Sequence, residues 1–118
     1  MRVFIAGLGL IGGSYAEGLT QKGYEVYGYN RTKESEKIAI ERGYIKDAGL
    51  KYLPLCEVVV LGFYPQLNVT FLNDIKNDLR PGQIITDVAG TKVEMIPQIE
   101  ALLPAYVHYV SHHPMAGR

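Results

Sequence analysis

The segment GLGLIG at residues 7–12 decides the fold of this 118-residue chain. It matches the spacing G-x-G-x-x-G, a pattern that is common and weak when it stands alone. Its position makes it informative, because the apolar run RVFIAG at 2–7 precedes it and apolar residues at helical spacing follow it as far as Gly23. The sequence therefore predicts a strand, a tight glycine turn and a helix that ends at a glycine.

Short β-rich runs and helical periods alternate along the rest of the chain, which predicts a parallel sheet with helices on both faces. We expect a helix after Thr32 and another that ends before the turn RPG at 80–82. A capping box at 91–94 favours a fourth helix, but Pro97 would break a helix begun there, so this helix starts later or bends. The expected strands are 2–7, 25–30, a weak one at 43–46, and then 57–63, 83–88 and 106–111.

Composition indicates one globular domain without a charge bias. Twelve basic and twelve acidic residues cancel, and no dense basic run offers a footprint for nucleic acid. No stretch is long and apolar enough to span a bilayer, and we expect no bound metal. The single cysteine, Cys56, lies in an apolar stretch and cannot form an internal disulfide. This favours a reducing compartment and a cytoplasmic location. Residues 1–16 imitate a signal peptide, but four glycines argue against that alternative.

The glycine segment offers a binding site for the pyrophosphate of a dinucleotide. Gly7 permits the tight turn, Gly9 lets a phosphate approach the backbone, and Gly12 lets helix and strand pack closely. The helix N-terminus then presents unpaired N–H groups to the phosphates. The alternative is that the glycines only make a tight turn. The predicted binding residues are Gly7, Leu8, Gly9, Leu10, Ile11 and Gly12.

The sequence YNRT at 29–32 ends the second expected strand, where sites for NAD usually place an Asp or Glu that binds the ribose. Asn30 is neutral instead, and Arg31 can bind the 2′-phosphate of NADP with its planar guanidinium. Thr32 adds a hydroxyl group. The residues therefore favour NADP over NAD, although a helix cap at Asn30 or Thr32 beside a solvated arginine would explain the same pattern.

Three further segments follow expected strands at the edge where open α/β sheets bind ligands: LGFYP at 61–65, DVAGTK at 87–92 and HHPMAG at 112–117. Together with GLGLIGGS at 7–14, this succession resembles the nucleotide-binding half of the prephenate dehydrogenase family, which includes the arogenate dehydrogenases. The resemblance covers the whole chain. It implies a Rossmann-type, doubly wound, mainly parallel six-stranded sheet and one NAD(P)-binding domain at 1–118.

The resemblance also implies a reaction, the oxidative decarboxylation of prephenate to 4-hydroxyphenylpyruvate in tyrosine biosynthesis, with hydride passing to the nicotinamide. The family's catalytic histidine is the one before Pro-Met-Ala-Gly, which is His113 here. An imidazole that accepts the hydroxyl proton of the substrate helps the carbonyl form. For the neighbouring His112 a structural role competes with a place beside the substrate, and His108 is expected to be structural.

The sequence departs from the family at Gly90, where many members have a serine whose hydroxyl joins the hydrogen bonds around the substrate. Thr91, a backbone N–H or a water would have to replace that hydroxyl, unless the substrate is oriented differently. Tyr64 and Pro65 follow the fourth expected strand and are predicted beside the cofactor, with the alternative that Pro65 merely starts the next helix.

Family members carry a second, helical domain that supplies the dimer contacts and the arginines for the substrate carboxylates. We therefore expect this chain to be the cofactor-binding half, to turn over little substrate alone, and to form a homodimer through the absent domain. The partner would be a small molecule, prephenate or arogenate. Two alternatives remain open: another NADP-dependent dehydrogenase of the imine or β-hydroxyacid type, and a non-catalytic dinucleotide-sensing module.

Overall fold

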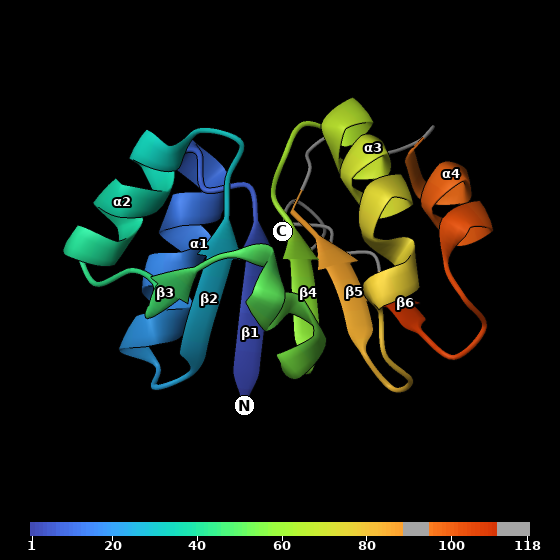
Figure 1. The fold of residues 1–118 in the computed structure, drawn as a ribbon, viewed down its shortest axis with the longest axis horizontal. Coiled ribbons are helices and arrows are strands. Elements are labelled where there is room, and N and C mark those ends of the chain that lie inside the picture. The colour runs from blue at the N-terminus through green and yellow to red at the C-terminus, as the bar shows by residue number, and fades with distance from the viewer. Residues whose placement is uncertain (89–94, 111–118) are drawn as a thin grey trace, which may run out of the picture.

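The computed structural model describes residues 1–88 and 95–110, which form a six-stranded parallel sheet in the order β3-β2-β1-β4-β5-β6 (Figure 1). The chain winds outward in one direction through β1–β3 and in the other through β4–β6, so the direction reverses between β1 and β4. Ligands bind at such a reversal in open α/β sheets. The strands are β1 Arg2–Ala6, β2 Glu25–Tyr29, β3 Asp47–Ala48, β4 Val58–Leu61, β5 Ile84–Asp87 and β6 His108–Val110.

Helices cover both faces of the sheet, and each face has its own apolar core. Side chains of β1 alternate between the two cores, since Val3 and Ile5 pack on the face of α1 and α2 and Phe4 on the opposite face. The second core is filled from α3, α4 and a short 3₁₀ segment, η1. The helical elements are α1 Leu10–Gln21, α2 Lys33–Glu41, η1 Leu50–Leu55, α3 Pro65–Ile75, η2 Lys76–Asp78 and α4 Met95–Leu102.

The doubly wound, six-stranded fold predicted from the sequence is confirmed, including the helix that follows Thr32 and the glycine that ends the first helix. Gly23 has a φ of 95°, in the left-handed region that glycine adopts most easily. The weak strand expected at 43–46 is wrong in position, because β3 consists of Asp47 and Ala48, and of the expected segment only Lys46 bonds to β2, through its N–H and the carbonyl of Val26. The described part of the fourth helix, Met95–Leu102, contains Pro97, and the capping box at 91–94 lies outside the described residues.

The described helices are short, and the longest of them, α1, has twelve residues. Across 1–88 and 95–110, no helix has the length and apolar character needed to cross a membrane.

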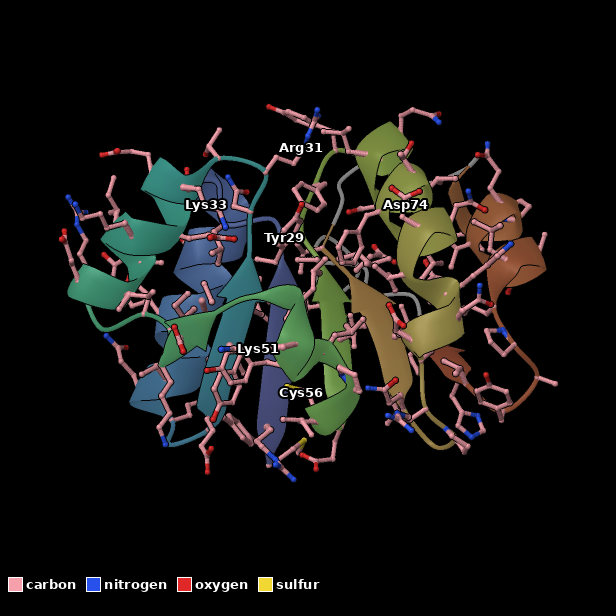
Figure 2. The ribbon with its side chains drawn as sticks, in the orientation of Figure 1. Tyr29, Arg31, Lys33, Lys51, Cys56 and Asp74 are labelled. Atoms are coloured by element: carbon pink, nitrogen blue, oxygen red, sulfur yellow. The ribbon has the colours of Figure 1, made fainter. Side chains whose placement is uncertain are left out.

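Cys56 lies at the end of the sheet opposite the glycine segment (Figure 2) and is 2% exposed, with its thiol donating to the carbonyl of Tyr52 at 3.3 Å. Burial raises the pKa of this thiol from 9.0 to about 12. The folded chain therefore holds the thiol proton more tightly than the unfolded chain does, and the thiol's contribution to stability is lost as the pH rises from about 9 towards 12.

At pH 8 we expect iodoacetamide to label Cys56 roughly a thousandfold more slowly in the folded chain than in urea, because only the thiolate reacts and its fraction falls tenfold per pKa unit. Mass spectrometry follows the labelling directly, since the chain has no other cysteine. Equal rates in the two states would show that the thiol is accessible and ionises normally.

Candidate dinucleotide-binding site

The turn from β1 into α1 lies at the point where the strand order reverses, and its outer two glycines are needed for its shape. Gly7 has a φ of +100°, and a Cβ there would lie 2.8 Å from the backbone of Gly62. A Cβ on Gly12 would lie 1.8 Å from the carbonyl oxygen of Gly7, so no side chain fits while α1 stays against the turn. These two glycines therefore bring helix and loop into direct backbone contact.

Gly9, the middle glycine, has a different environment. It is the N-cap of α1, has an ordinary φ of −75°, and an added Cβ would meet no atom of residues 1–88 and 95–110 within 4 Å. No side chain caps the helix, so its first N–H groups point towards the open space beside Gly9 without an intrahelical acceptor. A groove between α1 and α2 begins beside Gly9 and continues along the two helices to Glu17, Arg42 and Tyr44. A side chain on Gly9 would occupy the space that an anion needs, and this fits a bound pyrophosphate.

The turn from β2 into α2 is tied to the glycine segment by Asn30. Its side-chain oxygen accepts the N–H of Leu8 at 2.9 Å, and its side-chain nitrogen donates to the hydroxyl of Thr32 at 2.9 Å. That hydroxyl donates onward to Ser35 at 3.0 Å. Thr32 is the N-cap of α2 by position but makes no side-chain capping bond. Asn30 therefore holds two loops together, and its amide is engaged before any ligand arrives.

Arg31 projects from this turn at the carboxyl edge of the sheet, above Tyr29 (Figure 2). Its side chain is exposed, and it forms no salt bridge within the described part of the chain. Lys33 is also exposed but lies 3.8 Å from a carboxylate oxygen of Glu36. Of these two cations, Lys33 is the one with a salt bridge in the described residues.

A second loop, between β4 and α3, packs against the glycine turn. A Cβ on Gly62 would lie 2.9 Å from the carbonyl oxygen of Gly7, and the buried amide of Asn68 fixes the loop by accepting the N–H of Phe63 at 2.9 Å. Pro65 is the first residue of α3, as the structural alternative predicted. Tyr64 is 82% exposed at the helix start, so its ring is available at the same edge as Arg31.

The other end of this edge is described only in part. Asp87, at the end of β5, is fully buried and accepts a hydrogen bond from the hydroxyl of Tyr109. His108 lies on β6 with its side chain exposed and its backbone N–H bonded to the carbonyl of Gln83. The predicted substrate-side and catalytic residues lie outside the described residues: Gly90, Thr91, His112 and His113.

Three residues of this site were missed by the sequence analysis. Glu36 and Asn68 are buried polar side chains that accept backbone N–H groups of the two flanking loops, at Asn30 and Phe63. Gly62 makes the close contact between the loops. Only Gly62 carried a signal, because it directly follows an apolar strand and stands in the segment LGFYP at 61–65. Glu36 carried none, because it is one of five charged residues in the segment 33–41.

The parallel sheet, its reversal between β1 and β4, and the glycine turn at that reversal define a Rossmann-type nucleotide-binding domain. A family model described as "Prephenate dehydrogenase, nucleotide-binding domain" matches residues 15–118. The chain belongs to this family, which the prephenate and arogenate dehydrogenases share.

Individual proteins similar to this chain are also prephenate and arogenate dehydrogenases. The prephenate dehydrogenase of Lactococcus lactis subsp. cremoris is 34% identical over 122 residues, which cover 98% of this chain and 34% of that protein. The Synechocystis arogenate dehydrogenase structure is 30% identical with a TM-score of 0.88, covering 97% of this chain and 41% of that one. The A. aeolicus prephenate dehydrogenase, solved with hydroxyphenyl propionate and NAD⁺, is 25% identical with a TM-score of 0.86, covering 100% and 43%.

The chain spans about a third of the length of the curated relatives that it matches.

Proposed function

We propose that this chain is the cofactor-binding half of a dehydrogenase that acts on prephenate or arogenate and prefers NADP. The observation that carries the proposal is the open space at Gly9, the N-cap of an uncapped helix, where an added Cβ would meet no atom of the described residues within 4 Å. The family gives the reaction class. When bound, the dinucleotide accepts the hydride, and the residues of this chain hold it at the carboxyl edge of the sheet.

The pyrophosphate would bind the backbone N–H groups at the start of α1, beside Gly9. The adenosine end would lie between the β2–α2 turn and the β4–α3 loop, since these loops flank the glycine turn. Arg31 and Tyr64 are both exposed on those loops, and a guanidinium and an aromatic ring are groups that bind a 2′-phosphate and a nucleobase. We assign Asn30 and Thr32 to the same end, with Asn30 acting chiefly by holding the loops.

The substrate would lie next to the nicotinamide, where His113 accepts the proton of its hydroxyl group. Gly90, Thr91 and His112 are the other residues of this chain proposed to face it. A further domain would bind the carboxylates of the substrate and form the homodimer, and we place the protein in the cytoplasm. Assays of the full-length protein with prephenate and with arogenate, each with NADP⁺ and NAD⁺, test the reaction; turnover of neither substrate would overturn it.

Arg31→Ala should weaken NADP⁺ binding by about 10- to 100-fold, because it removes a charge-assisted contact worth about 1.5–3 kcal/mol, and should change NAD⁺ binding by no more than about twofold. Calorimetric titration with both dinucleotides measures the effect. The matched control is Lys37→Ala, which removes an exposed cation from α2 and should leave both affinities unchanged. An Arg31 variant that binds both dinucleotides like the wild type would place the arginine in solvent and remove the basis for the NADP preference.

A further inference from the structure

Glu36 is a buried carboxylate in the first turn of α2, and the proposed cofactor contacts do not use it. It is 6% exposed, whereas the other charged residues of the helix are exposed: Lys33, Glu34, Lys37 and Glu41. A carboxylate loses hydration when it is buried and is rarely kept there without partners. The partners of Glu36 therefore need to be identified.

The strongest contact of Glu36 is to the β2–α2 turn. Its Oε2 accepts the backbone N–H of Asn30 at 2.9 Å, while its Oε1 lies 3.8 Å from the ammonium of Lys33. The Lys33 side chain is 95% exposed, so water screens that ion pair strongly. The carboxylate thus fixes the first residue of the turn through a hydrogen bond, and its ion pair with Lys33 is weak.

Asn30 carries this contact further into the site. The backbone N–H of Asn30 donates to Glu36, and the side-chain oxygen of Asn30 accepts the N–H of Leu8 at 2.9 Å. A chain of hydrogen bonds therefore runs from the first turn of α2, through the end of β2, into the glycine turn. Loss of the Glu36 acceptor would loosen both the adenosine end and the pyrophosphate end of the site.

The charge of Glu36 has a second consequence, because NADP and NAD differ at this turn by a phosphate. Glu36 binds the residue directly before Arg31 and is itself 6% exposed, so a phosphate bound by Arg31 would meet a like charge that water screens only in part. The 2′-hydroxyl of NAD carries no charge and is not affected in this way.

We propose that Glu36 is a positioning residue with two separable effects: its hydrogen bond to Asn30 orders the turn for either dinucleotide, and its buried charge limits the preference for NADP. This inference rests on the proposed function, since it requires that a dinucleotide binds at the turn. Loss of the hydrogen bond should therefore weaken the binding of NAD⁺, and loss of the charge should change the ratio of Kd for NADP⁺ to Kd for NAD⁺.

The test is calorimetric titration of the wild type and three variants with NADP⁺ and NAD⁺. Glu36→Gln keeps an acceptor for Asn30 and removes the charge, so the ratio of Kd for NADP⁺ to Kd for NAD⁺ should fall by about tenfold while Kd for NAD⁺ stays within about twofold. Glu36→Ala also removes the acceptor, and Kd for NAD⁺ should rise by about tenfold. Glu34→Gln makes the same charge change at an exposed position of the same turn and should leave the ratio within about twofold.

A Glu36→Gln variant whose ratio matches that of Glu34→Gln would overturn the inference. So would a Glu36→Gln variant that loses both dinucleotides equally or fails to fold, because the residue would then be structural only. In each of these outcomes the wild type still binds a dinucleotide and the proposed function stands. A wild-type chain that binds neither dinucleotide would instead overturn the proposed function, and this inference with it.

Discussion

Gly9→Val should abolish dinucleotide binding, with affinity falling at least about a hundredfold, and should leave the fold intact. The φ of Gly9 is −75° and an added Cβ lies more than 4 Å from every described atom beyond its chain neighbours, so the side chain costs the apo protein little. It would, however, enter the space in front of the uncapped N–H groups of α1, where hydrogen bonds to a charged phosphate contribute about 1.5–3 kcal/mol each.

Two variants make this result interpretable. Gly18→Val adds the same side chain to α1 at another position where a Cβ meets nothing, and it should bind like the wild type. Gly12→Ala should unfold or strongly destabilise the chain, because its Cβ would lie 1.8 Å from the oxygen of Gly7. Thermal melting separates these cases. A Gly9→Val protein that melts normally and keeps its affinity for both NAD⁺ and NADP⁺ would show that the glycines make only a tight turn.

His113→Asn in the full-length protein should lower kcat by about 10² to 10⁴ and leave Kd for the dinucleotide unchanged. The proposed imidazole accepts a proton as hydride leaves the substrate, and general-base catalysis contributes a factor of this size. Asparagine retains hydrogen bonding but cannot accept that proton at neutral pH. Steady-state kinetics and a separate cofactor titration measure the two quantities.

The control for this variant is His108→Asn, which changes an exposed histidine on β6, in the segment that leads towards His113. It should keep both kcat and cofactor affinity near those of the wild type. Near-normal turnover of His113→Asn would end the assignment of this histidine as the base. A parallel loss of cofactor affinity would show instead that His113 supports the nucleotide site.

The architecture could be predicted because its signals are local. Apolar runs mark strands buried on both faces, and glycine spacing marks the turn at the reversal of strand order. The third strand was misplaced for a physical reason: Ile45 is 3% exposed, so its apolar signal reported burial in the core, whereas the strand pairing begins two residues later at Asp47. In a central strand the buried residues are also the ones that pair with neighbouring strands, whereas beside a short edge strand a buried residue can lie outside the paired segment.

The site was less predictable, because its polar contacts join segments far apart in the chain. The sequence placed Asn30 among the cofactor-binding residues, but nothing in it shows that the N–H of Leu8, 22 residues away, already occupies the amide oxygen. Glu36 looks like one more solvated charge on a helix until the turn brings the N–H of Asn30 onto it. A buried acceptor is recognised by the donor it satisfies, and only the fold supplies that donor.

Calorimetric titration of the chain with NADP⁺ and with NAD⁺ measures whether the turn at residues 7–12 binds a dinucleotide. We expect saturable binding at one site per chain, with NADP⁺ the tighter ligand and the two dinucleotides competing with each other. The absence of saturable binding by either dinucleotide, in protein that melts cooperatively, would contradict it.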